Sequence, residues 1–595
     1  MPIPTGIFIL LAVLIYVVSY LTHGKYLEKK IVEANPSKVT PALRFYDGVD
    51  YTPTSKFILY GHHFASIAGA GPIVGPAIAL AWGWLPTLLW IWFGNVFIGV
   101  VHDYLSLMAS VRHEGRSISW IAGQLLGKRA SYIFNLYVWF ALILVIAAFI
   151  AVTSAFFTGV PGSGLAAIVL IGMAVLVGLV MYRTRLGVTG GTLLAIASVI
   201  ISVAVGYMFG DAFGHAMASL AAMLGISTRQ LWMLILAIYC VIAASLPVWL
   251  LLQPRDFTNV LILWASLIIG GAAAVIAWHP AEIPAITSFA PRIIHGVPTP
   301  FWPCIPLIVA CGALSGFHSL VASGTTSKQL ANELDALLVA YGGMLSEGFL
   351  ATMVVATMAA FVPAAMLMIA SPSIKTVITS MLHNPGLFGD KYAYFLKTLG
   401  KWKLIPLSYA LTVHQAFGLD IKAMTIFATI WITGFALTSL DTAARLARFS
   451  WHELMMGIRS TSIKKALTNK WFASVLAVLL GLLLAWNGSF LILWPSFSGM
   501  NQLLASLALM VISAWIYRIC RGTASRLLVI VPALFLWITV TCALVWYEMT
   551  VVPSLMAGGG MGMLTGAIVG TILGISLALN IVLMCLFIRS RKTQQ

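Results

Sequence analysis

The chain has very little charge. Only 9% of its 595 residues are Asp, Glu, Lys or Arg, whereas 61% are hydrophobic. A soluble domain usually carries about 25% charged residues, so a water-soluble fold of this composition is excluded. The longest polar runs are of loop size and cover residues 23–56, 370–403 and 441–470. The solvent of this protein is therefore largely lipid.

Cysteine pairs and nucleotide motifs are also lacking. The six cysteines stand singly, without a CxxC pair, which argues against a disulfide framework and a zinc ribbon. No GxxxxGK[ST] motif occurs, so the chain has no P-loop ATPase of its own. No HxxxH or HExxH spacing occurs either, and we expect neither a metal nor a cofactor. The N-terminus lacks the cationic region and the cleavage site of a signal peptide, so residues 5–22 are interpreted as a retained helix.

What the chain does contain is a series of long apolar segments. A membrane-spanning helix needs about 20 mainly apolar residues. Residues 404–418 are a candidate for a short re-entrant piece. The sequence predicts an all-α integral membrane protein with about 15 transmembrane helices, at 5–22, 57–81, 84–109, 131–157, 163–182, 187–209, 229–252, 257–279, 302–325, 342–369, 420–440, 471–487, 490–517, 527–549 and 560–588.

Lys and Arg are distributed unequally between the loops. With the N-terminus outside and the C-terminus in the cytoplasm, most of the 34 Lys and Arg residues fall in cytoplasmic loops, as the positive-inside rule requires. The net charge of +17 then reflects membrane topology, and no nucleic-acid partner is expected. Six cationic residues between Lys375 and Lys422 lie on the outer side in this scheme. They leave the topology of 371–420 open.

One predicted span is rich in residues that disfavour a helix. Residues 61–76 contain four glycines and two prolines, together with two histidines. Non-helical backbone at membrane depth is tolerated only where it is buried in protein or lines a cavity. Transporters use such breaks to free backbone groups for substrates and ions. The sequence therefore predicts a broken helix around Ser66–Pro72, with a kinked packing helix as the alternative.

A second polar group lies at residues 315–327. It contains His318 and the hydroxyl residues Ser323, Thr325 and Thr326, which offer either ligands for a cation or caps for a helix end. His63 and His318 are each followed by a glycine six residues later, but one coincidence of this length is weak evidence for an internal repeat.

Ionisable residues inside spans are costly and indicate function. Histidine titrates near neutral pH, and buried carboxylates can be tuned towards it. An interfacial salt bridge or a helix cap is the alternative at several of these positions. Asp441 and Arg445, at i and i+4, can pair with each other. The candidates for carrying protons are His62, His63, His102, Asp103, His318 and Glu347.

At these motifs the sequence resembles the carbon starvation protein A (CstA) family of bacterial transporters. The residues that carry the resemblance are GHHFASIAGAGPIVGPAIA (61–79), VHDYLSLMASVRHEGRSI (101–118), LPVWLLLQPRDF (246–257), CGALSGFHSLVASGTTSKQL (311–330), YGGMLSEG (341–348) and TSLDTAARLARF (438–449). The resemblance implies proton-driven uptake of peptides, or of pyruvate and similar small carboxylates. It also implies the inverted five-plus-five-helix repeat of leucine-transporter-type (APC superfamily) proteins.

In that scheme a leading helix and loop (1–56) precede a transporter core (57–449, with repeats at about 57–209 and 229–440), and about four helices follow (450–595). Core helices 1, 6, 8 and 10 are 57–81, 229–252, 302–325 and 420–440. The second break is expected at the end of 229–252, where Pro247 and Pro254 bracket residues 248–253. A sodium ion, or a proton-bearing group in its place, is expected between the 67–71 backbone and Ser323, Thr325 and Thr326. The expected substrate and helix-break residues are Ser66, Gly69, Gly71, Pro72, Pro247 and Gln253.

Three hypotheses follow from the sequence. The leading one is a multi-pass secondary transporter of the bacterial inner membrane, whose partners are a small solute and the lipid bilayer. The second is a nutrient sensor with a transporter fold, for which residues 441–470 are the sizeable cytoplasmic surface. The third is a membrane enzyme that uses the histidines with a metal. The sequence does not distinguish peptide from pyruvate, H⁺ from Na⁺, or one oligomeric state from another.

Overall fold

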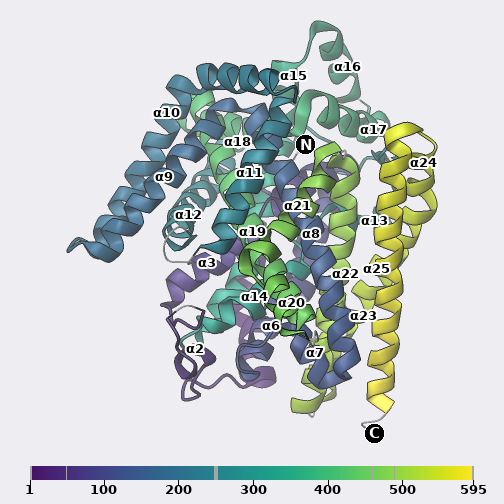
Figure 1. Ribbon diagram of the computed structural model, residues 1–595. Coiled ribbons are helices and arrows are strands. Elements are labelled where there is room, and N and C mark those ends of the chain that lie inside the picture. Colours follow the sequence, from purple (N-terminus) through teal and green to yellow (C-terminus); the bar gives the residue numbers. More distant parts are fainter. Residues whose placement is uncertain are drawn as a thin grey trace.

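The computed structural model describes residues 3–48, 50–246, 252–382, 384–456, 460–487, 490–520 and 522–592. Within these residues the protein is helical except for one short hairpin, so the predicted all-α class is confirmed (Figure 1). Twelve helices of the described part are long and apolar enough to span a membrane, or thirteen when one bent pair is counted as a span.

The first half of the chain forms a run of helices, several of which are joined by single turns of 3₁₀ or π geometry. They are α1 (Gly6–Ser19), α2 (Pro41–Arg44), α3 (Lys56–Ala68), α4 (Gly71–Ala79), α5 (Trp84–Gly94), α6 (Val100–Arg112), α7 (Ile118–Leu126), α8 (Lys128–Gly159), α9 (Pro161–Arg183), α10 (Gly187–Met223), α11 (Thr228–Ser245) and α12 (Leu252–Ala277).

The second half begins with the hairpin. Its elements are β1 (Arg292–Ile294), β2 (Val297–Pro298), α13 (Phe301–Ile308), α14 (Gly316–Gly324), α15 (Gly343–Ile369), α16 (Pro372–Leu382), α17 (Pro385–Phe395), α18 (Lys401–Phe417), α19 (Ile421–Met455), α20 (Thr461–Leu467), α21 (Lys470–Asn487), α22 (Phe490–Ile519), α23 (Thr523–Trp546), α24 (Val552–Met556) and α25 (Gly560–Lys592).

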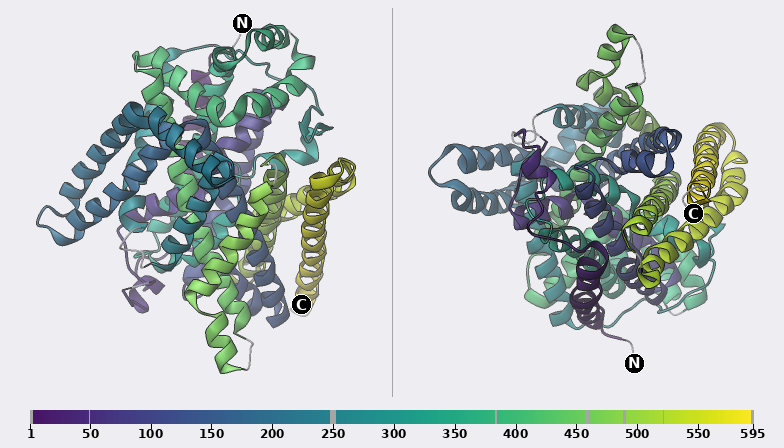
Figure 2. Two further views of the ribbon diagram at one scale, coloured as in Figure 1. Left: turned by 45° about the horizontal axis from the view of Figure 1, so that its top comes forward. Right: turned by 90° about the horizontal axis from the view of Figure 1, so that it is seen from below.

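Helix α8 lies at the centre of the bundle. In its most apolar stretch 94% of the residues are buried, and it packs against α19, α21 and α22. Helices α9 and α10 pack mainly against each other and project to one side, whereas α23–α25 cover the opposite side (Figures 1 and 2). Helices α16 and α17 lie at the end of the bundle near the N-terminus, and α2, α7 and the C-terminus lie at the other end (Figure 1).

The helix predicted at 57–81 is broken, as its glycines and prolines suggested. Helices α3 and α4 are bent by 43° relative to each other, and Gly69 between them has φ of +48°. Residues with a side chain rarely adopt this conformation, so glycine is required at the break.

The helix predicted at 302–325 is not continuous, which corrects the sequence interpretation. Helix α13 ends at Ile308, and an irregular segment runs to Ser315 before α14 begins. Gly312 in this segment has φ of +87°, which a helix cannot accommodate. The apolar run between Cys304 and Leu314 concealed the break, because hydropathy does not report backbone conformation. Among the described residues this is the second broken helix.

Three other expectations concern single segments of the chain. The expected bend at 247–254 lies largely outside the described residues, Pro247 among them, and Pro254 stands in the first turn of α12. The candidate re-entrant piece at 404–418 is α18, which packs between α12, α15 and α19. Of residues 441–470, most of those that the structure describes are helical rather than a loop, since α19 continues to Met455 and α20 follows.

Candidate functional site

The two broken helices meet at their breaks. A Cβ atom on Gly71, at the start of α4, would lie 2.5 Å from Cys311 Cβ, and one on Gly75 would lie 2.6 Å from the carbonyl oxygen of Ile308. Such contacts are possible only for glycine, so Gly71 and Gly75 allow α4 to lie directly against the 309–315 segment. Discontinuous helices that meet in this way form the binding site of many secondary transporters.

The carbonyl groups of the second break receive hydrogen bonds from distant side chains. Asn95 Nδ2 donates to the oxygen of Gly312 at 2.8 Å. Gln502 Nε2 donates to the oxygens of Ala310 at 2.8 Å and Leu314 at 3.0 Å. Because unpaired carbonyls in an apolar interior are costly, these donors stabilise the irregular backbone. The break is therefore supported by the tertiary structure.

The first break has a smaller set of contacts. Ser439 Oγ on α19 donates to the carbonyl oxygen of Ser66 at 3.1 Å, and Gly69 packs against Phe149. The hydroxyl of Ser66 is buried without a hydrogen-bond partner among the described residues. Of the expected substrate residues, Gly69, Gly71 and Pro72 thus lie at or beside the junction of the breaks. Pro247 is outside the described residues, as is the side chain of Gln253.

Four of the predicted proton-carrying residues form one buried chain next to this junction. His102 Nδ1 lies 2.9 Å from Asp103 Oδ1, and His318 Nδ1 lies 3.0 Å from Asp103 Oδ2. The other ring nitrogen of His318 lies 3.5 Å from Glu347 Oε2. All four side chains have 0% exposure and come from α6, α14 and α15. The sequence indicated each residue separately, and the fold connects them.

The position of His318 between two carboxyl groups constrains its protonation. A neutral imidazole carries a single N–H and can donate to only one of Asp103 and Glu347. The contacts of His318 with Asp103 and with Glu347 are both favourable when one further proton is present. The imidazole ring of His318 or the carboxyl group of Glu347 can carry that proton. Neither Glu347 oxygen has a hydrogen-bond partner among the described residues. The chain Glu347–His318–Asp103–His102, called here the buried relay, is therefore suited to holding an exchangeable proton.

His62 and His63 face different surroundings. His63 is fully buried, and its Nδ1 lies 2.8 Å from the Thr326 hydroxyl. His62 is partly exposed, and its Nδ1 lies 3.3 Å from Asp256 Oδ2. Since neighbouring residues on a helix point in different directions, the two histidines belong to separate networks.

The network beyond His62 contains a buried arginine that the sequence interpretation missed. Arg255 on α12 is 2% exposed, donates to Asp256 at 2.7 Å, and pairs with Asp441 on α19. Tyr239 on α11 also contacts Arg255. The expected pair between Asp441 and Arg445 is wrong, because Arg445 instead donates to the carbonyl oxygen of Leu246 at 3.0 Å. The motif PRDF marked the position, but only the fold shows which carboxylate Arg255 meets.

The hydroxyl groups of the expected cation site are engaged elsewhere. Ser323 Oγ donates to the Ser319 oxygen at 2.6 Å, and Thr325 Oγ1 donates to the Val321 oxygen at 2.9 Å, both within α14 or at its end. Thr326 alone of the three contacts α3, through His63. The hydroxyl that does reach the first break belongs to Ser439. The expected cation site assumed that 302–325 is one straight helix. Because this helix is broken, the end that carries these hydroxyls lies in a different place.

Thr326→Val is expected to slow uptake about tenfold, because His63 Nδ1 loses its partner and an unpaired buried group costs about 1–3 kcal/mol. Thr325→Val is the matched control and should stay within about twofold of the parent rate, since among the described residues its hydroxyl bonds only to the Val321 oxygen. Initial uptake rates in proteoliposomes measure both. In the double variant Thr325→Val/Thr326→Val, a full uptake rate and an unchanged cation dependence would contradict a cation site at these hydroxyls.

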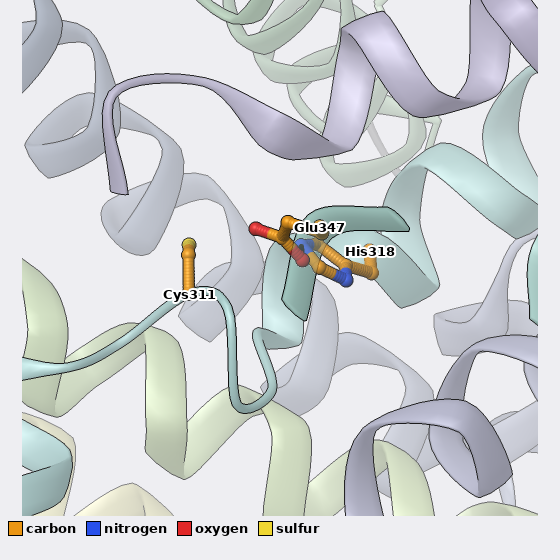
Figure 3. A group of neighbouring side chains, drawn as sticks. All are labelled: Cys311, His318 and Glu347. Carbon is orange, nitrogen blue, oxygen red and sulfur yellow. Dashed lines mark ion pairs between the residues drawn. The ribbon is translucent and has the colours of Figure 1, made fainter. Parts of the chain in front are cut away.

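Three groups that can bind metals converge at the second break. Ligand atoms of Cys311, His318 and Glu347 lie within 4.8 Å of one another, and all three side chains are buried. Figure 3 shows His318 beside Glu347, with Cys311 on the adjoining irregular segment. A mixed sulfur, nitrogen and oxygen set could bind a transition metal. His318 and Glu347 already face each other, however, and the expectation of no resident metal stays a prediction.

A cavity of about 280 Å³ lies between this core and the α2–α7 end of the bundle. Ser323 and Gly324 of α14 form part of its lining, and Lys328, Arg116 and Glu453 supply charge. Burial lowers the pKa of Lys328, whose Nζ lies 5.5 Å from the ring of Tyr51. The cavity thus lies beside the end of α14, the second half of the second broken helix.

The structure defines a polytopic helical membrane protein with two broken helices that meet beside a buried relay of titratable groups. The chain belongs to the family described as carbon starvation protein CstA, whose family model matches residues 5–543.

Curated relatives match over most of their length. The peptide transporter CstA of Escherichia coli (strain K12) is 31% identical over 89% of this chain and 79% of its own. The peptide transporter CstA of Bacillus subtilis (strain 168) is 33% identical over 89% and 88%. The pyruvate/proton symporter BtsT of Escherichia coli (strain K12) is 30% identical over 90% and 80%. Among solved structures, MhsT in complex with L-phenylalanine has a TM-score of 0.43 at 13% sequence identity. The match covers 83% of this chain and 98% of the MhsT chain, but a TM-score of this size supports no argument.

Proposed function

We propose that this protein is a proton-coupled secondary transporter that imports peptides or small carboxylates such as pyruvate across the bacterial cytoplasmic membrane. The names of the relatives, peptide transporter and pyruvate/proton symporter, support the substrate classes. The observation that carries the coupling is the buried relay, which adjoins the junction of the two broken helices. The N-terminal end of the chain faces outward and the C-terminal end inward, so α16 and α17 lie outside.

The substrate would bind where α4 meets the 309–315 segment. Helix α4 begins at Gly71, and the next residue, Pro72, has no amide N–H. The Ile73 amide donates to the Ala70 oxygen at 3.3 Å, which leaves the Gly71 amide to face a ligand at this helix start. Together with the helix dipole this amide favours a carboxylate. The start of α14 is less available, because Asn501 Oδ1 already accepts from the Phe317 amide at 2.8 Å. A substrate carboxylate is therefore assigned to the α4 end of the junction.

The proton would move between Glu347 and His318. Glu347 lies on α15 and His318 on α14, so the 3.5 Å contact between them depends on how the inner half of the second broken helix packs. A proton on Glu347 removes a buried charge and leaves His318 neutral, whereas its transfer to His318 creates an ion pair with two carboxylates. Each state favours a different position of His318 on α14 relative to Glu347 on α15, which is the requirement for coupling proton movement to alternating access.

The packing of the helices supports an inverted repeat whose second unit begins later in the chain than the sequence predicted. Helix α4 packs on α15, and α14 packs on α6. Each broken helix thus contacts the long helix that follows the other, as two related units would. The first repeat then begins at α3 and the second at α13, rather than at residue 229. The matched spacing of His63–Gly69 and His318–Gly324 is unrelated, because His63 precedes its break and His318 follows it.

Uptake by the purified protein in liposomes tests the function. Labelled pyruvate and labelled di- and tripeptides are compared with and without an imposed pH gradient, alkaline inside. We expect one class to accumulate only with the gradient and to be released by a protonophore. Accumulation that is indifferent to the gradient would contradict proton coupling, and failure to take up either class would contradict the substrate assignment.

A further inference from the structure

A second concave site lies at the α16–α17 end of the bundle, away from the buried relay. It is a pocket of about 400 Å³ between the β1–β2 hairpin and α17. Ile293, Leu387, Ala393 and Tyr394 supply most of its apolar lining. Basic groups of Arg292, His295, Lys391 and Lys397 surround this lining. Together these residues are called the outer pocket.

The charges of the outer pocket do not cancel within it. Asp390 is its single carboxylate, and this group accepts from the backbone amide of Arg292 at 2.6 Å and lies 3.9 Å from the guanidinium of the same residue. Lys391 and Lys397 make no ion pair with any residue that the structure describes. Burial and the charge of Lys397 lower the pKa of His295, which therefore remains neutral at pH 7 and can donate a hydrogen bond without adding charge.

These lysines are also unusual in their location. Positive residues are disfavoured on the outer side of a membrane protein, yet six lie between Lys375 and Lys422. Within this group Lys422 is neutralised by Asp211 at 3.0 Å, and Lys401 is buried. Lys391 and Lys397 have no such structural role and instead lie beside an apolar hollow.

The walls of the outer pocket are attached to the outer halves of both broken helices. Strand β2 is separated from the start of α13 by two residues. On the other wall, the Tyr392 hydroxyl of α17 donates to the Ala77 oxygen of α4 at 2.7 Å. The indole of Trp82, just beyond α4, donates to the Thr299 oxygen at 3.1 Å. A ligand between the hairpin and α17 would therefore bridge the parts of the structure that cover the outer ends of α4 and α13.

We propose that the outer pocket binds an organic anion with a small apolar body, and that it captures the transported carboxylate before the carboxylate reaches the broken helices. Lys391 and Lys397 pair with the carboxylate, while Ile293 and Tyr394 contact the apolar part. A positively charged hollow raises the local concentration of anions and the rate of their association. The assignment of the transported solute as the ligand rests on the proposed function.

Uptake kinetics of the whole chain in proteoliposomes test the capture role. In K391Q/K397Q we expect the KM for the transported carboxylate to rise about threefold to tenfold with kcat unchanged, as for the loss of two exposed ion pairs. K391R/K397R keeps the charge and should retain the parent KM. K375Q is the matched control, because Lys375 is an exposed lysine on α16 that does not line the pocket. A parent-like KM in K391Q/K397Q, or an equal rise in K375Q, would overturn the proposal.

A second measurement does not require transport. The protein in nanodiscs is treated with a hydrophilic amine-reactive reagent, and the labelling of Lys391 and Lys397 is followed by mass spectrometry with pyruvate, a dipeptide or neither. We expect the transported anion to protect both lysines but not Lys375.

Protection without any uptake by the parent protein would support the site and reject the proposed function. Uptake without protection would reject the site. Protection by phosphatidylglycerol in the nanodisc, with none by pyruvate or peptide, would assign the pocket to a lipid headgroup and overturn the capture role.

Discussion

Glu347→Gln is expected to lower proton-driven accumulation of substrate at least about 100-fold, the usual scale for loss of a group that must carry a proton. Glutamine is nearly isosteric with glutamate but cannot release a proton, so His318 would face a permanently neutral partner. Exchange of labelled for unlabelled substrate should persist, because the junction of the broken helices is unchanged. The pH dependence of uptake should also flatten, since one proton acceptor of the relay is absent.

Exchange of labelled for unlabelled substrate and gradient-driven uptake are measured on the same proteoliposomes. Together they distinguish a loss of proton coupling from a loss of the folded protein. Glu282→Gln is the matched control, because Glu282 is an exposed carboxylate that lies 3.8 Å from His279, outside the buried relay. It should transport at the parent rate. Gradient-driven accumulation and an unchanged pH profile in Glu347→Gln would show that Glu347 is not the proton carrier. Loss of exchange as well as accumulation would show that it has a structural role.

Some of the site could be predicted because its signal is local. The first break was predictable from the glycines and prolines around Gly69 and Pro72, which disfavour a helix whatever surrounds them. The members of the buried relay were predictable one by one, because a carboxylate or imidazole in an apolar segment is costly without a function. Those costs can be judged from the sequence around a single residue.

The rest depends on contacts between distant parts of the chain. The second break is stabilised by donors such as Asn95 and Gln502, which are far from Gly312 in the sequence. Arg255 reaches Asp441 across 186 positions, although Arg445 is nearer to Asp441 along the chain. The connection of Asp103 to Glu347 through His318 needs three helices to be placed correctly. Such partners cannot be deduced from one sequence by spacing alone.

Gly71→Ala is expected to impair transport strongly, because it forces the two broken helices apart. The new Cβ would lie 2.5 Å from Cys311 Cβ, so α4 and the 309–315 segment would have to separate. Overpacking of this kind typically costs about 1–3 kcal/mol of stability. Because the substrate is proposed to bind at this junction, we expect transport to fall by about 100-fold, more than the loss of stability explains, since misplacement by about 1 Å can have this effect. Thermal unfolding and uptake of the same preparations measure the two effects.

A size exchange distinguishes the contact from a general loss of stability. In Gly71→Ala/Cys311→Gly the added methyl group faces the space that the cysteine side chain vacates, so transport should recover by at least about tenfold relative to Gly71→Ala. Gly172→Ala is the matched control, because Gly172 lies on exposed α9 with no heavy atom within 4 Å of the added Cβ. It should leave uptake unchanged and stabilise the helix slightly. Parent-like transport by Gly71→Ala would show that the two breaks need not touch, and the substrate site would have to lie elsewhere.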